Sequence, residues 1–172
     1  TKKLLSYGRE VIPLIDTITE FNDFTPLHIQ RVLEIKNRIF FGDSEKALKG
    51  WIENGAHNLI EGISIIDYLE YPDYDPEELY SDLDRLKLDV WIELSDNQSP
   101  VDKIRRLNHV FYSLYGFKGD TDDYHNIDNS VLHRVFQRRI GNPISLSIIY
   151  STVCQKLGIP VFGVNLPQHF IL

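Results

Sequence analysis

The sequence lacks several features that mark specialised classes of protein. It contains one cysteine, Cys154, and no methionine. A single thiol excludes an intrachain disulfide framework and a zinc site built from several cysteines. The sequence has no run of about 18 apolar residues, so it offers no transmembrane helix, and Thr1–Leu5 lack the apolar stretch of a signal peptide. These absences predict a soluble, cytoplasmic protein that does not bind membranes.

Positive charge is also scarce. The chain carries 18 Lys and Arg against 25 Asp and Glu, for a net charge of −7. Nucleic-acid binding relies on a basic surface that neutralises phosphates, so we expect no nucleic-acid partner. The histidines do not follow metal-ligand spacing, and we expect neither a metal nor a cofactor. The histidines considered are His28, His57, His109, His125 and His133.

What is present is a globular composition with helical patterning. The chain has 172 residues and is 42% hydrophobic, which suits one domain, or one domain with an added helical layer. Apolar residues recur at helical spacing through the first two thirds, as in Leu79, Leu83, Leu86 and Val90. After Gly158 the pattern changes to two strand-like segments. The sequence therefore predicts a helix-rich α+β fold, with its strands at 161–164 and 170–172.

The change of pattern suggests two regions. We predict a helical N-terminal region over residues 1–97 and a core over residues 98–172. Within the first region, Gly42-Asp43-Ser44 is expected to interrupt a helix, with Ser44 capping the next one. Because the chain starts without Met and ends on an apolar segment, we expect a fragment whose sheet continues past Leu172.

The run from Arg138 to Ser147 holds the most informative local signal. Asn142 can cap a helix, and Pro143 suits its first turn, where a missing N–H costs nothing. Helix N-termini concentrate positive partial charge and lower the pKa of a thiol placed there. His169 is on a predicted strand against which this helix should pack. A helix start facing a strand histidine is the arrangement used by cysteine–histidine hydrolases and acyltransferases.

Several short motifs, in order and at compatible spacing, resemble the SirB-type transglutaminase-like family. They are Asn129-Ser130, Arg138-Arg139-Ile140-Gly141-Asn142-Pro143-Ile144-Ser145-Leu146-Ser147, Lys156-Leu157-Gly158-Ile159-Pro160-Val161 and Gly163-Val164-Asn165-Leu166-Pro167-Gln168-His169-Phe170. The resemblance is dense from about residue 100 to residue 172.

The resemblance implies a transglutaminase-like core, a relative of papain-type thiol enzymes that use Cys, His and Asp. It places the thiol position at or beside Pro143, which cannot act as a nucleophile. It places the histidine at His169 and the acid beyond Leu172. By the same resemblance, Asn142, Pro143 and Gln168 are candidate binding residues.

The residues near this helix that could take part in catalysis each have a structural interpretation as well. Ser145, in the first turn, could face His169, or it could bond to the main chain, as serine commonly does near helix starts. Cys154 lies about three turns into the helix and is predicted to be a buried small hydrophobe. His169 is either a site residue or a core histidine with its hydrogen bonds satisfied.

Two charged groups of residues lie just before the run from Arg138 to Ser147 or at its beginning. The acidic segment Asp120–Asp128 could bind a hard cation, but a solvated loop is the simpler interpretation. The basic residues Arg134, Arg138 and Arg139 could hold an acidic partner or the chain's own carboxylates.

Three functional hypotheses follow. The first is a non-catalytic interaction module whose cleft, having lost its thiol, binds a peptide or protein. The second is an acyl-transfer enzyme or hydrolase that uses His169 as base, with the nucleophile displaced to Ser145 or to a residue beyond Leu172. In the third, the helical region carries the function and the core is a scaffold. The sequence specifies neither the partner nor the oligomeric state.

Overall fold

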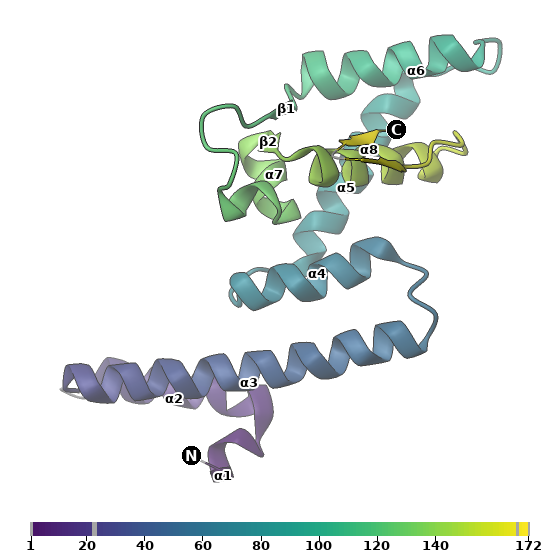
Figure 1. Ribbon diagram of the computed structural model, residues 1–172. Coiled ribbons are helices and arrows are strands. Elements are labelled where there is room, and N and C mark those ends of the chain that lie inside the picture. The colour runs from purple at the N-terminus through teal and green to yellow at the C-terminus, as the bar shows by residue number, and fades with distance from the viewer. Residues whose placement is uncertain (1, 22–23, 168, 172) are drawn as a thin grey trace. The chain divides into compact units, whose positions relative to one another are not determined.

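The computed structural model describes residues 2–21, 24–167 and 169–171 (Figure 1). For residues 2, 21, 165, 169 and 170 it describes the main chain only. The chain divides into two compact units, Thr1–Tyr74 and Asp75–Leu172.

The regular secondary structure in the described residues of the first unit is helical. Its long helix begins where the sequence predicts, with Thr25 at the N-cap and Pro26 at the first helical position. Asn58 caps the last helix of the unit by accepting a hydrogen bond from the Glu61 N–H. The elements are α1 (Lys2–Leu5), a 3₁₀ turn (Gly8–Val11), α2 (Ile12–Phe21), α3 (Pro26–Glu53) and α4 (Leu59–Glu70).

The predicted break at Gly42–Ser44 is wrong, because α3 runs through it without interruption. One glycine costs a helix interior about 1 kcal/mol, which tertiary packing can offset. Here Phe40, just before the glycine, is buried and meets Tyr68 of α4 edge to face. Ser44 is buried in mid-helix and does not occupy a cap.

The second unit combines helices with two short pairs of strands (Figure 1). Strand β1 runs parallel to β2, and β3 runs antiparallel to β4. The elements are α5 (Pro76–Glu93), α6 (Pro100–Asn108), a π-helical turn (His109–Leu114), β1 (Lys118–Gly119), a 3₁₀ turn (Ile127–Asn129), α7 (Leu132–Arg138), β2 (Ile140–Gly141), α8 (Pro143–Lys156), β3 (Val164–Leu166) and β4 (His169–Ile171).

Helix α5 belongs to this second unit, whereas the sequence placed residues 1–97 together. All four predicted seam residues of α5 are fully buried. The helix contacts α7 and α8, which come later in the chain. The boundary between compact units therefore falls before α5, at Tyr74 and Asp75.

The π-helical turn changes which residues face the core. The helical spacing after Pro100 predicts that Val101, Ile104, Phe111 and Leu114 face inward. Leu114, at the end of the π-helical turn, is instead 62% exposed, and so is Val101, in the first turn of α6, at 59%. Phe111 is buried as predicted, and Val110 is buried beside it. A π turn holds more residues than an α turn, so the apolar face after it no longer follows the 3.6-residue period.

The strands bear out the predicted class, a helix-rich α+β fold, but their positions differ from the prediction. The strand expected at 161–164 begins only at Val164. Strand β1 lies at the start of the polar segment 118–128, whose composition predicts a loop. Helix α8 contacts β4, the strand that contains His169. No helix in the described part of the chain is long and apolar enough to cross a membrane.

Candidate functional site

The start of α8 is built as the local sequence predicts. The Asn142 side chain accepts a hydrogen bond from the Ser145 N–H at 2.8 Å, and Pro143 occupies the first helical position. The Leu146 N–H donates to the Asn142 carbonyl at 3.1 Å. The cap and the proline thus use or remove most donors that a helix start would offer to an anion.

Ser145 faces the protein interior. It is 2% exposed, and its hydroxyl lies 2.7 Å from the Asn129 carbonyl oxygen and 3.0 Å from that of Asn142. A hydroxyl hydrogen shared with main-chain acceptors joins the helix start to the preceding turn. This is the structural alternative that the sequence left open. The catalytic role of Ser145 stays a prediction that this geometry does not favour.

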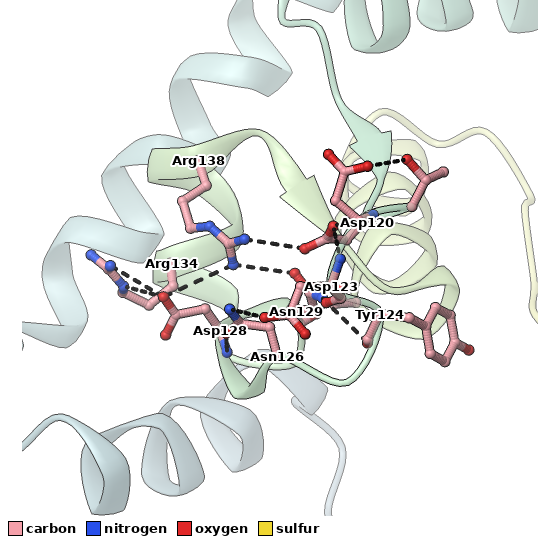
Figure 2. A network of polar contacts seen from close by, with 11 residues as sticks. Asp120, Asp123, Tyr124, Asn126, Asp128, Asn129, Arg134 and Arg138 are labelled. Carbon is pink, nitrogen blue, oxygen red and sulfur yellow. Dashed lines mark hydrogen bonds and ion pairs between the residues drawn. The ribbon is translucent and has the colours of Figure 1, made fainter.

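Asn129 links the preceding loop to this helix start (Figure 2). Its side-chain amide donates to the Asp123 carbonyl at 2.8 Å and to the Tyr124 carbonyl at 3.3 Å. Its Oδ1 accepts from Arg138 at 3.1 Å, and its own carbonyl accepts from the Asn142 N–H at 3.0 Å. Because Asn129 is buried, each of these bonds replaces one that water would make.

The basic residues of this segment pair with the chain's own carboxylates. Arg134 contacts Asp128 at 3.2 Å, and Arg138 contacts Asp120 at 3.2 Å (Figure 2). Asp120 also accepts the main-chain N–H of Asp123 at 2.9 Å. Among the described residues, no group of three or more His, Cys, Asp and Glu side chains is placed to hold a metal. The acidic segment therefore forms an internal polar network.

The third arginine, Arg139, adopts a left-handed backbone conformation with φ of 58°. Its guanidinium lies 4.7 Å from the ring centre of Tyr115 and 5.0 Å from that of Phe117. Burial lowers its pKa from the ordinary value for arginine. Cation–π contact with its own aromatic neighbours is thus the role that the structure gives it.

The Asp120 network predicts a pH-dependent stability. The Asp123 N–H and other donors, including Arg138, hold the pKa of Asp120 below its usual value of 3.8. A carboxyl whose pKa is lowered by folding stabilises the protein above its unfolded pKa, and this contribution is lost as the pH falls through the folded pKa. We expect Asp120→Asn to destabilise the protein at pH 7 and to differ less from wild type at pH 3.

Urea unfolding at the two pH values, followed by hydrogen exchange of the α7 amides, measures this effect. Asp96→Asn, in the exposed loop before α6, is the control. A difference between Asp120→Asn and wild type that is equal at both pH values would contradict the assignment.

A pocket of about 690 Å³ opens beside α8. Three of its lining residues, Pro143, Leu146 and Ser147, lie on the first two turns of that helix. Its other apolar walls come from Ile104, Val161 and Ile171, while Gly119 of β1 lines it without a side chain. Sites that bind small molecules or side chains are typically concave, largely apolar and of this volume.

The polar groups of the pocket are few and uncharged. The Tyr150 hydroxyl donates to Asn108 Oδ1 at 2.8 Å, and both residues line the pocket together with Tyr112. Burial raises the pKa values of Tyr112 and Tyr150 above that of a free tyrosine, so both phenols are neutral at pH 7. None of the described lining residues carries a formal charge.

The predicted site residues fall into three groups. Pro143 lines the pocket, and Asn142 caps the helix beside it. Ser145 faces away from the pocket into the turn. Gln168 lies outside the described residues, and His169 is described only by its main chain in β4.

The sequence indicated Tyr150 as an aromatic residue that could fill the groove beside His169, but it did not indicate Asn108 and Tyr112 as site residues. Asn108 and Tyr112 are four residues apart, which indicates a shared helix face. Their convergence on Tyr150, 42 positions later, depends on tertiary packing and leaves no local signal.

Cys154 is fully buried, as predicted. Burial raises the pKa of its thiol to about 12. The thiolate is the reactive form of cysteine, so this residue is inert in the folded protein.

Gly141 sets how closely β2 approaches α8. A Cβ at this position would lie 2.6 Å from Ser145 Oγ and 2.9 Å from a Val135 methyl group. We expect Gly141→Ala to cost about 1–3 kcal/mol of stability through overpacking. Gly119→Ala is the matched control, because its Cβ would meet nothing within 4 Å. Chemical denaturation should separate the two variants, and equal stabilities would contradict the close approach.

Comparison with known proteins agrees with this architecture. Residues 77–172, which begin inside α5, match the transglutaminase-like superfamily. The chain belongs to the transglutaminase-like superfamily. Its transglutaminase-like domain therefore coincides with the second compact unit and includes the pocket. No solved structure matches the chain.

Curated relatives match parts of this chain. A UPF0162 protein of Xylella fastidiosa (strain Temecula1) is 43% identical over 70 residues, covering 41% of this chain and 25% of that protein. Mouse F-box only protein 21 is 47% identical over 66 residues, covering 38% of this chain and 10% of that protein. A Vibrio cholerae UPF0162 protein is 29% identical over 117 residues, covering 68% of this chain and 43% of that protein. The chain thus spans less than half the length of each.

Proposed function

We propose that this protein is a non-catalytic, SirB-type transglutaminase-like module that uses its cleft to bind a segment of another protein. The pocket beside α8 is the binding site. In this proposal Pro143 stands where the thiol of the family's enzymes would be. The protein acts in the cytoplasm, and its ligand is a peptide segment, not a nucleic acid or a membrane.

The observation that carries this proposal is what the helix start presents to the pocket. Pro143, which has no reactive group, forms part of the wall, and Ser147 is the hydroxyl that the start of α8 adds to it. The Ser145 hydroxyl bonds to main-chain carbonyls, and the chain's one thiol, Cys154, is buried farther along α8. A nucleophile must be exposed beside a base and an oxyanion site to act. The described residues of the helix start therefore favour binding over acyl transfer.

The chemistry of the lining supports a peptide ligand. An uncharged wall of aliphatic and tyrosine side chains can bury an apolar side chain without desolvating a charge. The few hydroxyl and amide groups can fix the orientation of a polar main chain.

Peptide display on phage tests the proposal. A library of random linear peptides is selected on the immobilised full chain. Selected peptides should bind wild type and lose binding to Ser147→Phe, which fills the pocket. Ile144→Phe adds the same ring to α8 at an exposed position outside the pocket and should bind normally. No enrichment on wild type, or equal binding to both variants, would contradict the proposal.

A further inference from the structure

The hydrogen bonding of β1 determines what the pocket offers to a ligand. The Lys118 N–H donates to the Arg139 carbonyl at 3.0 Å, and the Asp120 N–H donates to the Gly141 carbonyl at 3.3 Å. In this parallel pair, Gly119 is registered with Gly141. Successive residues of an extended strand turn their N–H and C=O groups to opposite edges. The Gly119 N–H and C=O therefore point away from β2.

No strand of the described residues lies on the edge to which Gly119 turns these groups. Among the described residues the sheet consists of β1 and β2 alone. Gly119 is exposed and forms part of the pocket wall. A Cβ built on it would meet nothing within 4 Å. Within the described part of the chain, the Gly119 N–H and C=O thus have no hydrogen-bond partner and lie beside an apolar cavity.

We propose that the pocket binds an extended peptide segment of a partner protein by strand addition to β1 at Gly119. The segment exchanges main-chain hydrogen bonds with Gly119 and places one apolar side chain in the cavity. This inference rests on the proposed function and names the binding mode of the same site.

The strand edge at Gly119 and the neighbouring cavity together favour an extended peptide as the ligand. An exposed strand edge is a template for another extended chain, and a neighbouring pocket then selects one side chain of that chain. The cavity is large enough for any single aliphatic or aromatic side chain, and its described walls are uncharged. A purely apolar ligand would leave the Gly119 N–H and C=O without a partner in the complex.

The test uses substitutions at Gly119 that differ in one hydrogen-bond donor. Gly119→Pro removes the N–H, which β1 does not use to pair with β2, and proline is tolerated where a strand's N–H faces solvent. Gly119→Ala keeps the donor and extends its methyl group into open space. Any difference in affinity between these two variants therefore reports the Gly119 N–H.

The probes are capped pentapeptides Ac-Ala-Ala-Xaa-Ala-Ala-NH₂, with Xaa as Leu, Ile, Val, Phe or Tyr, titrated into ¹⁵N-labelled full-length chain. We expect at least one to shift the Gly119 amide resonance of wild type. Gly119→Pro should bind that peptide about fivefold to tenfold more weakly than Gly119→Ala, which keeps the N–H, and this difference is the equivalent of one hydrogen bond. The same peptide N-methylated at its three central residues should lose binding to wild type, a readout that is independent of how the proline variant folds.

The outcomes separate this inference from the proposed function. Equal binding by the Pro and Ala variants, with full binding of the N-methylated peptide, would overturn strand addition and leave a binding pocket. No binding of any probe to wild type would overturn both. Gly119 shifts that depend on protein concentration alone would mean that a second copy of the chain occupies the edge, and the partner-peptide proposal would be wrong.

Discussion

Replacing Phe111 with alanine is expected to lower the free energy of unfolding of the second unit by about 3–5 kcal/mol. Phe111 is 1% exposed and lies at the centre of the aromatic cluster that supports the pocket. Its ring stacks on Phe117 at 4.4 Å between centres and meets Tyr150 edge to face at 5.3 Å. Truncation therefore removes buried apolar area, ring–ring contacts and the support of one pocket wall.

Hydrogen exchange of the α8 amides at increasing urea concentration measures this loss for the second unit alone. Leu114→Ala is the matched control, because Leu114 lies on the same π-helical turn and is largely exposed. It should change stability by about 0.5 kcal/mol or less. If the two variants lost similar amounts of stability, the placement of Phe111 in the core and Leu114 at the surface would be wrong.

Asn129→Ala is expected to cost about 2–4 kcal/mol, because a buried side chain that makes several part-buried hydrogen bonds is removed. The carbonyls of Asp123 and Tyr124 lose a donor, and Arg138 loses an acceptor. The loop before α7 and the start of α8 should both exchange faster, since Asn129 connects them. Removing one member of a buried polar network usually costs more than one exposed hydrogen bond contributes.

The exposed residue Asn97, replaced by alanine, is the control for this variant. Peptide-resolved hydrogen exchange distinguishes a local effect from a general one. If Asn129→Ala and Asn97→Ala showed the same exchange in α8, the link from the loop to the helix start would be refuted.

Local signals in the sequence predicted the elements that local chemistry determines. The α5 seam follows from helical spacing, and its four residues are fully buried. The start of α8 follows from an asparagine cap and a proline, which act within one turn. The buried Cys154 follows from its position in an apolar helix. Each of these depends on residues only a few positions apart.

What the sequence did not predict depends on contacts between distant segments. Packing against α4 keeps α3 helical through Gly42, and the π turn exposes Leu114. The pocket gathers residues from Ile104 to Ile171, so no short window contains it. The inward direction of the Ser145 hydroxyl depends on Asn129, 16 residues earlier.

The alternative to binding is acyl transfer with His169 as base, and it needs a nucleophile in this cleft. Within the described part of the helix start, Ser147 is the hydroxyl that lines the pocket, and Ser145 is the one predicted from the sequence. An activated serine would attack an aryl ester, retain its acyl group and release the phenol. The central claim is that neither serine does so.

Incubation with p-nitrophenyl acetate, followed by mass spectrometry of the peptides that contain Ser145 and Ser147, tests this claim most directly. The account predicts no acetyl ester on either serine and p-nitrophenol release equal to that of a Ser145→Ala/Ser147→Ala variant. An acetyl ester on one of these serines that disappears in His169→Ala would contradict the account and identify the protein as an enzyme.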